Sequence, residues 1–184
     1  MLANLLPKEV DRAKVEIWSE DESRVGQQGS LTRIWAQKGT RPRKVKQRQF
    51  ISTYIYAAAC HKTGQSYGMI LPYVNTDTMN IFLDGLSKEV GIERHIALIV
   101  DNAGWHGAAD LIVPSNITLV PLPPYAPELN AMEQVWEWMK THFLYNQSYS
   151  DYEDIVEKLS DAWNQISDNT DLIKSIIHRG WIHL

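Results

Sequence analysis

The order of apolar and polar residues predicts a series of strands followed mainly by helices. Four stretches of the first half are rich in β-branched and aromatic strand formers: 15–21, 33–39, 48–60 and 66–73. The last two of them are expected to form a hairpin around the turn HKTGQ. Two later stretches, 95–102 and 117–123, are almost continuously apolar, which is typical of strands buried on both faces of a sheet.

Helical periodicity is found between and after these strands. Thr76 or Asp77 is expected to cap a helix that runs to about Val90 and ends at Gly91. The apolar face of this helix comprises Met79, Phe82, Leu83 and Leu86. Further helices are expected at 130–146, 150–166 and 170–179. A strand meander that continues into strand–helix–strand units predicts a mixed sheet with helices on both faces.

The composition is that of a single globular domain. The chain has 184 residues, of which 44% are hydrophobic, so it can bury a sizeable core. Cys60 is the only cysteine, which excludes an intrachain disulfide and favours a reducing compartment. The apolar runs are too short to span a bilayer, and the N-terminus lacks the layout of a signal peptide. We therefore expect a soluble cytoplasmic domain over residues 15–184, preceded by a linker at 1–14.

Positive charge is concentrated in one segment of an otherwise acidic chain. The net charge is −4, but seven of the 18 basic residues lie between positions 33 and 48, with no acid among them. These residues, which we call the basic segment, are Arg33, Lys38, Arg41, Arg43, Lys44, Lys46 and Arg48. Such a segment predicts a local surface for a phosphate backbone, and a solvated hairpin or loop is the alternative.

Two aspartates adjoin strands that are expected to be buried. Asp21 ends the stretch VEIWSED, and Asp101 directly follows the run IALIV. A carboxylate beside a buried run is costly unless it is paired, and two carboxylates brought together repel each other. A divalent cation such as Mg²⁺ or Mn²⁺ removes both problems. The alternative is a solvated acid at position 21 and a turn or cap residue at position 101.

Glu133 offers a third carboxylate near the start of an aromatic-rich helix. With Asn130 as the N-cap, the pattern Asn-x-x-Glu is that of a capping box. The apolar arc of the helix includes Val135 and Trp136, and Glu133 falls just beside it. Its carboxylate is therefore expected to lie near the sheet, where it can cap the helix or join the two aspartates as a metal ligand.

The sequences around these acids resemble those of one enzyme family. VDNAGWH and LPPYAPELNAMEQVWEWMK, with 31 residues between Asp101 and Glu133, are similar to DDE-type transposases of the bacterial insertion-sequence branch of the mariner superfamily. Asp21-Glu22-Ser23 matches the family's Asp-Glu-Ser after its first strand, and WAQKGTRP resembles its Trp-x-x-x-Gly-x-x-Pro stretch. The resemblance covers approximately residues 15–145.

The chain departs from the family in two respects. Ala126 and Ala131 replace the usual Ser and Pro, but neither position is a ligand, and Asn130 keeps the helix cap. Family members also carry helix-turn-helix units before the catalytic domain, whereas this chain begins about fourteen residues before its first strand. We therefore expect a separately encoded helix-turn-helix half joined by frameshifting, or else a trimmed or decayed copy.

The resemblance implies a ribonuclease H-like α/β fold, in which an antiparallel meander and parallel strands form a mixed five-stranded sheet with helices on both faces. It implies that Asp21, Asp101 and Glu133 hold two Mg²⁺ ions, replaceable by Mn²⁺, about 3.5–4 Å apart. The implied activity is metal-dependent cleavage at transposon ends and strand transfer into a TA-containing target. The implied partners are DNA and a second copy of the chain, in the nucleoid.

Neighbouring residues have a structural interpretation beside the functional one. His106 is expected to contact the scissile phosphate or orient a carboxylate, or else to pack against Trp105. Asn102 either bonds beside the metal or serves as a turn residue, and Tyr125 with its flanking prolines is expected to shape a loop. Core or interface positions, rather than base-stacking positions, are expected for Trp136, Trp138 and Trp163.

Three other functions fit parts of this pattern. A ribonuclease H-like nuclease or a Holliday-junction resolvase would use the same three acids. A catalytically silent or regulatory DNA-binding fragment of a split transposase would not need them, and a structural scaffold would bind no Mn²⁺. Strand transfer, metal-dependent cleavage and metal binding therefore separate these hypotheses.

Overall fold

The structure, a computed structural model, describes residues 6–8, 10–29, 32–33, 36–40, 43, 46–124, 126, 129–180 and 182. The strands are β1 (Val15–Gly26), β2 (Ser52–Cys60), β3 (Ser66–Leu71), β4 (His95–Val100) and β5 (Ile117–Pro121). The α-helices are α1 (Thr76–Val90), α2 (Met132–Met139), α3 (Tyr152–Ser167) and α4 (Thr170–Ile177). The described residues also form the 3-10 helices η2 (Arg12–Lys14) and η3 (Gly104–Gly107) and the π-helix η5 (Lys140–Leu144).

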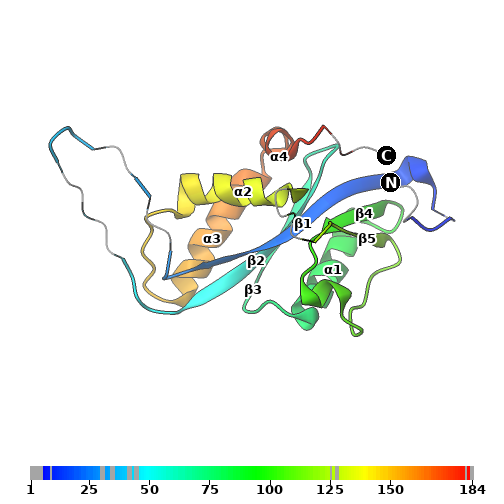
Figure 1. Cartoon of the computed structure of the whole chain (residues 1–184), viewed down its shortest axis with the longest axis horizontal. Helices are drawn as coiled ribbons and strands as arrows, with labels where there is room; N and C mark the ends of the chain where they lie inside the picture. Colours follow the sequence, from blue (N-terminus) through cyan, green and yellow to red (C-terminus); the bar gives the residue numbers. More distant parts are fainter. Residues whose placement is uncertain are drawn as a thin grey trace.

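The five strands form one sheet in the order β3-β2-β1-β4-β5 (Figure 1). β2 pairs antiparallel with both β1 and β3, whereas β4 runs parallel to both β1 and β5. β1 is the long central strand, so that its first residues pair with β4 while the remainder continues along β2. The predicted mixed five-stranded sheet, with an antiparallel meander and parallel strands, is confirmed.

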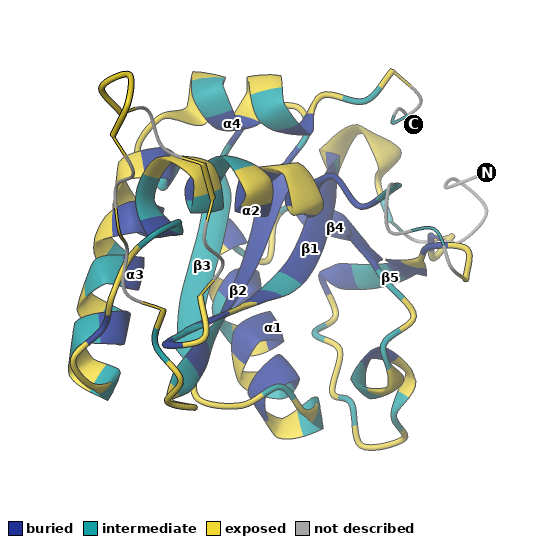
Figure 2. Ribbon diagram, turned by 60° about the vertical axis from the view of Figure 1, so that its left-hand side comes forward, coloured by how far each residue is buried: buried dark blue, intermediate teal, exposed yellow. Residues whose placement is uncertain are grey.

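Helices cover both faces of the sheet (Figure 2). α1 packs on one face, where the strand residue Trp18 meets Phe82 and Leu86. α2, α3 and α4 pack on the other face, in a core that includes Trp136 and Trp163. The four residues predicted for the apolar face of α1 are all fully buried. Full burial of large apolar side chains is worth about 1.5–3 kcal/mol each, so these two layers hold the sheet between them.

The side chains of β1 alternate between the two layers, as in any strand. Trp18 joins the α1 layer, and Val25 joins the layer of α2, α3 and α4. By this alternation Glu20 and Glu22 lie on the α1 side, and Asp21 lies on the α2 side. The central strand therefore carries acids on both of its faces.

Two predictions about strands are wrong in part. The described residues of the range 33–39 form no strand, and Thr40 instead bonds through its N–H and Oγ1 to the Gln37 carbonyl in a turn. A strand needs a neighbouring ladder for its backbone groups, and no ladder includes the described positions of this range. β5 lies at the sheet edge, so only Ile117 and Val120 within it are buried, rather than both of its faces.

Helix boundaries also differ from those predicted. Asn75 is the N-cap of α1, because its side chain accepts from the Thr78 N–H and the Thr78 hydroxyl completes a capping box. The helix expected at 130–146 begins at Met132 and widens into a π-helix, in which the Tyr145 N–H bonds to the Lys140 carbonyl. Across the described residues, no helix combines the length and apolar character required to cross a membrane.

Gly68 of β3 tests how tightly α3 packs on the sheet. A Cβ at this position would lie 2.4 Å from Cε2 and Nε1 of the Trp163 indole. We expect Gly68→Ala to lower the free energy of unfolding by about 1–3 kcal/mol, because the indole must move within a filled core. Gly180→Ala is the matched control, since nothing in the described part of the chain lies within 4 Å of a Cβ there. Urea unfolding followed by tryptophan fluorescence compares the two, and equal stability would contradict tight packing at Gly68.

Candidate active site

Asp21 lies within β1 on the face covered by α2 and is 9% exposed. The Trp136 indole Nε1 donates a hydrogen bond of 2.8 Å to Asp21 Oδ2. Asn130 Nδ2 donates to the Glu20 carbonyl oxygen at 2.8 Å, and its Oδ1 accepts from the Met132 N–H at 3.1 Å. Asn130 therefore ties the start of the helix to the strand, but the N-cap lies one residue later than predicted, at Ala131, which forms no side-chain cap bond. Two side chains thus fix α2 above the Asp21 carboxylate.

Negative charge gathers around Asp21. Burial raises its pKa from 3.8 to about 7, together with the negative charge of Glu133 and smaller contributions from Glu22 and Asp101. The hydrogen bond from Trp136 opposes this shift. Asp101 and Glu133 therefore lie close enough to act on one carboxyl group, although the first follows β4 and the second lies in α2. The fold therefore brings Asp101 and Glu133 within electrostatic range of Asp21.

Asp101 follows β4 and is held by its own loop. Its Oδ1 accepts from the Ala103 N–H at 2.8 Å and lies 3.0 Å from His106 Nδ1, which is also 3.1 Å from the Asp101 carbonyl oxygen. The side chain remains 47% exposed. It borders two hollows of about 480 and 430 Å³, formed by the loops after β4 and β5. Asp101 thus has one restrained oxygen and access to space in which a ligand fits.

Glu133 is exposed in the first turn of α2. Its backbone N–H bonds to the Asn130 carbonyl at 3.4 Å. Within the described part of the chain its carboxylate forms no hydrogen bond or ion pair, so it does not complete the expected capping box. Both of its oxygens are available to a ligand.

A second group of ionisable side chains lies on the other face of β1. Glu20 is fully buried, and neither of its carboxylate oxygens has a hydrogen-bond partner in the described structure. His106 Nε2 lies 3.5 Å from Glu20 Oε2 and 3.6 Å from Glu22 Oε1. The Trp105 indole donates to Glu22 Oε1 at 2.8 Å and lies edge-on to the His106 ring. Among the described residues, only Glu20, Glu22 and His106 form a trio of potential metal ligands within 4.8 Å of one another.

The two groups of acids are electrostatically linked. Burial raises the pKa of Glu20 well above its usual value, and the charges of Glu22, Asp21 and Asp101 raise it further. Burial works to lower the pKa of His106, but Glu22 and then Asp101 outweigh it and raise that pKa. His106 therefore keeps its proton to a higher pH than an ordinary histidine, and its two ring nitrogens connect acids of β1 to Asp101.

Sequence reasoning did not identify Glu20 as part of the site. Of the acids in this part of β1, only Asp21 was predicted as a site residue. The available signal was the alternation of a strand, which places Glu20 and Glu22 together on the face opposite to Asp21. Their contact with His106 depends on the position of η3 over that face. No local sequence pattern predicts this position.

The donor set around Asp21 suits a hard divalent cation. Asp21 and Asp101 each have one oxygen in hydrogen bonds and one without a partner in the described residues, and Glu133 has two. The ligand atoms of these three acids do not all lie within 4.8 Å of one another. A wider spacing is compatible with two cations about 3.5–4 Å apart, which are bound from different sides. Divalent charge would also offset the repulsion that raises the Asp21 pKa.

The remaining predicted site residues lie around these acids or outside the described part. Asn102 is exposed, and its Nδ2 donates to the Leu122 carbonyl, so it joins the loops after β4 and β5. Trp136 and Trp163 are core residues with ring centroids 6.2 Å apart. The described members of the basic segment are all exposed: Arg33, Lys38, Arg43, Lys46 and Arg48. Outside the described residues are Arg41, Lys44, Trp35, Tyr125 and Pro127.

The environment of Asp21 makes stability depend on pH. Its folded-state pKa of about 7 lies above its ordinary value of 3.8, so the folded protein keeps a proton that the unfolded chain releases. The resulting stabilisation, up to roughly 4 kcal/mol, is complete below about pH 4 and is lost as the pH rises through about 7. Without divalent cations, we expect Asp21→Asn to gain stability relative to the original protein between about pH 5 and about pH 8.

Urea unfolding in the presence of a chelator, at about pH 5 and at about pH 8, measures the difference in stability between Asp21→Asn and the original protein. Asp161→Asn, at an exposed position of α3, is the matched control and should show no such gain. A stability difference for Asp21→Asn that does not change with pH would contradict the raised pKa.

Comparisons with known proteins agree with this geometry. The family described as DDE superfamily endonuclease matches residues 16–156, a range that contains Asp21, Asp101 and Glu133. The uncharacterized protein y4pE/y4sA of Sinorhizobium fredii (strain NBRC 101917 / NGR234) is 43% identical over 130 residues, covering 71% of this chain and 96% of that protein.

Solved structures of Mos1 share the fold. The Mos1 Strand Transfer Complex matches 88% of this chain and 50% of the Mos1 chain, with a TM-score of 0.66 and 21% identity. The Mos1 mariner paired end complex with Mn matches 88% and 51%, with a TM-score of 0.67 and 20% identity. The chain thus spans about half the length of these solved chains, and the predicted ribonuclease H-like fold is confirmed. Because the family match extends over most of its residues, this chain belongs to the DDE superfamily of endonucleases.

Proposed function

We propose that this chain is a transposase catalytic domain that cleaves DNA at transposon ends and transfers the cut strand into target DNA. The observation that carries the proposal is the setting of Asp21, a buried carboxyl group on which the charges of Asp101 and Glu133 converge. Carboxyl groups with pKa values perturbed by burial and by specific neighbours cluster at functional sites. Membership of the DDE superfamily supports phosphoryl transfer on DNA as the reaction class.

Asp21, Asp101 and Glu133 are the residues that would hold two Mg²⁺ ions, or Mn²⁺ in their place. When bound, such ions activate the attacking oxygen and stabilise charge on the leaving oxygen of a phosphodiester. The donor set fits them, because it offers carboxylate oxygens without hydrogen-bond partners in the described structure. Mos1 paired end complexes with Mn and with Mg support the same choice of cation.

The chain's other residues would position these acids rather than react. Trp136 orients the Asp21 carboxylate, and His106 with the Ala103 N–H orients that of Asp101. Asn102 keeps the loop that carries Asp101 against the end of β5. Water and a DNA 3′-hydroxyl are sufficient nucleophiles, so no nucleophilic side chain is required.

DNA is the proposed macromolecular partner. The basic segment supplies exposed cations that can neutralise backbone phosphates, and the Mos1 structures include strand transfer and paired end complexes. A homodimer on DNA, a TA-containing target, association with the nucleoid and a separately encoded helix-turn-helix half belong to the same proposal. So does the assignment of residues 15–184 to one catalytic domain.

Asp101→Asn tests the proposed chemistry. The substitution keeps the size of the side chain but removes a metal-binding charge, so we expect DNA cleavage to fall by more than about 100-fold. Since Asp101 is half exposed in a loop, stability should change by less than about 1 kcal/mol. Cleavage of a labelled duplex carrying the sequences that flank the coding DNA, in Mg²⁺ or Mn²⁺, is the measurement. Asp110→Asn, at an exposed loop position, is the matched control.

The same assay separates the alternatives. Joining of the cut strand to a second duplex supports a transposase, whereas cleavage without joining supports a nuclease or resolvase. DNA binding without metal-dependent cleavage supports a regulatory fragment. Undiminished cleavage by Asp101→Asn would refute the proposed site.

His106→Ala tests the proposed positioning of Asp101. Loss of a side chain that orients a metal ligand typically costs about 10–100-fold in metal affinity or activity. We therefore expect Mn²⁺ affinity, measured by calorimetric titration, to fall within that range relative to the affinity of His142→Ala. His142 is an exposed histidine stacked on Trp138, so its removal should leave Mn²⁺ affinity unchanged. Equal Mn²⁺ affinity in the two variants would show that His106 is only a packing residue.

A further inference from the structure

Glu20, Glu22 and His106 form a compact set of potential ligands outside the proposed active site, which we call the trio. Its two acids lie on the α1 face of β1, whereas Asp21 lies on the face covered by α2. The ligand atoms of the trio lie within 4.8 Å of one another, and no other group of histidine, cysteine or acidic side chains in the described part of the chain is as close. One cation can therefore reach all three side chains.

Two members of the trio are buried without hydrogen bonds at their ligand atoms. Neither Glu20 oxygen nor His106 Nε2 has a hydrogen-bond partner in the described structure, and the two side chains are 0% and 4% exposed. The separations of His106 Nε2 from Glu20 Oε2 and Glu22 Oε1, 3.5 and 3.6 Å, exceed the roughly 2.7–3.2 Å of a hydrogen bond. Buried polar atoms without hydrogen bonds are costly, so these atoms favour a ligand that satisfies them.

The separations within the trio suit a tetrahedral cation. Zn²⁺ binds histidine nitrogen and carboxylate oxygen at about 2.0–2.2 Å, so two of its ligand atoms at a tetrahedral angle lie about 3.3–3.6 Å apart. Both distances from His106 Nε2 fall within this range. A mixed nitrogen and oxygen set also favours Zn²⁺ over Mg²⁺, which prefers oxygen ligands. Three protein ligands leave the fourth position of Zn²⁺ to water.

The groups behind the trio orient its side chains for metal binding. His106 Nδ1 lies 3.0 Å from Asp101 Oδ1 and 3.1 Å from the Asp101 carbonyl oxygen. A proton on Nδ1 leaves Nε2 to bind a cation, and a carboxylate or carbonyl behind the opposite ring nitrogen is the usual setting of a metal-bound histidine. The Trp105 indole holds Glu22 through a hydrogen bond of 2.8 Å to Oε1. Both contacts fix the ligands before a cation binds.

The segment that carries His106 is itself held against the fold. Leu111 packs against the core around α1. Asn80 of α1 donates from Nδ2 to the Asp110 carbonyl at 3.1 Å, and its Oδ1 accepts from the Ile112 N–H at 2.7 Å. The hollow of about 430 Å³ after β4 borders the His106 side chain, so a cation from solvent can approach it.

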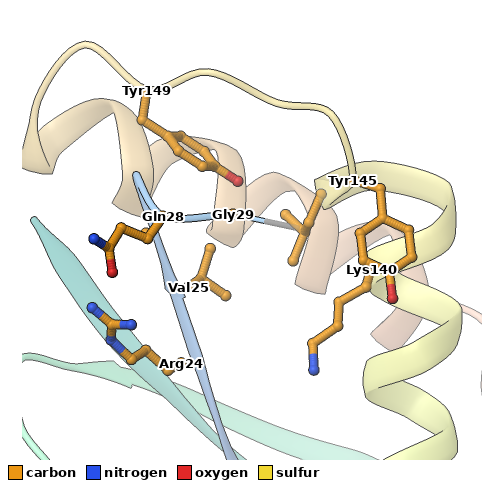
Figure 3. A pocket seen from close by; sticks show the side chains of 9 residues that line it. Arg24, Val25, Gln28, Gly29, Lys140, Tyr145 and Tyr149 are labelled. Atoms are coloured by element: carbon orange, nitrogen blue, oxygen red, sulfur yellow. The ribbon is translucent and has the colours of Figure 1, made fainter. Parts of the chain in front are cut away.

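The hollow near the end of β1, which Lys140 and Tyr149 border, offers a cation no such ligands (Figure 3). The described residues that line it include no histidine, cysteine, aspartate or glutamate. The ammonium group of Lys140 would also repel a cation. A cation that binds outside the three acids of the proposed active site is therefore expected at the trio and not at this hollow.

We propose that Glu20, Glu22 and His106 form a second metal site, which binds one Zn²⁺ ion and joins β1 to the loop after β4. The site shares no ligand with the proposed active site and lies on the opposite face of β1. It does not depend on the proposed function, because a chain that cleaves no DNA can still bind Zn²⁺ there. The ion would hold η3 on the strand and, through the His106 ring, keep Asp101 in place.

Zinc titration in a large excess of Mg²⁺ tests this site, with binding to the full chain measured by calorimetry. Glu20→Gln and Glu22→Gln each keep the size of the side chain but remove a charged ligand. Each should weaken Zn²⁺ binding by more than about 100-fold, which exceeds the roughly 10–100-fold loss typical of a residue behind a ligand. Glu133→Gln, in the proposed active site, and Glu153→Gln, at an exposed position of α3, are the matched controls and should keep the original Zn²⁺ affinity.

Co²⁺ in place of Zn²⁺ reports the coordination geometry. Four-coordinate Co²⁺ absorbs visible light far more strongly than six-coordinate Co²⁺, so we expect intense bands from the original protein and from Glu133→Gln. His106→Ala should lack these bands, whereas His142→Ala, which changes an exposed histidine, should keep them. Zn²⁺ should also raise the thermal midpoint of the original protein but not that of Glu20→Gln, because it binds only the folded site.

The outcomes separate this inference from the proposed function. Zn²⁺ binding that Glu133→Gln abolishes and Glu20→Gln leaves unchanged would place the ion at the other acids and refute the second site. A thermal midpoint of the original protein that Zn²⁺ does not change would show that the trio is a metal-free ion pair, and would refute it as well. Loss of Zn²⁺ binding in both trio variants, without DNA cleavage by the original protein in Mg²⁺, would support the site and refute the proposed function alone. Should Glu20→Gln not fold, Glu22→Gln must still lose Zn²⁺ binding.

Discussion

Repulsion among carboxyl groups on the central strand is the constraint on which this structure depends. Glu20 and Asp21 are neighbours in β1, lie on opposite faces, and both have raised pKa values because they are buried near other acids. Such an arrangement costs stability unless protons, cations or hydrogen bonds compensate it. A chain selected for stability alone would not place these groups in its central strand. Their retention is readily understood if divalent cations bind there during function.

Two elements hold the acids in place from opposite sides of the sheet. On one side, Asn130 and Trp136 bind α2 to β1, so Glu133 in the intervening turn has a fixed position although its side chain is exposed. On the other side, His106 lies between Glu20 and Asp101 and joins β1 to the loop after β4. Both sets of contacts are polar and buried, at sites where apolar packing would be more stable. They restrict the orientation of Asp21 and Asp101 while leaving one oxygen of each free of hydrogen bonds.

Helix α2 fixes the position of one acid of the proposed site. Its apolar face, which includes Val135 and Met139, is buried in the core, so the helix cannot rotate without exposing that face. Glu133 lies beside this face in the first turn of the helix, so the packing of α2 fixes where its carboxylate stands relative to the acids of β1.

Local sequence determined much of this molecule, because strands, helices and motif residues leave short-range patterns. The five strands, the helix containing Glu133 and the identity of Asp21, Asp101 and Glu133 as candidates all follow from periodicity, spacing and resemblance. The expected strand at 33–39 was wrong at its described positions, since composition cannot supply a partner ladder. Only the tertiary structure showed that Glu20 is buried against His106. These two residues are far apart in the chain, and their proximity is decided by the alternation of β1 and by the position of η3 over one of its faces.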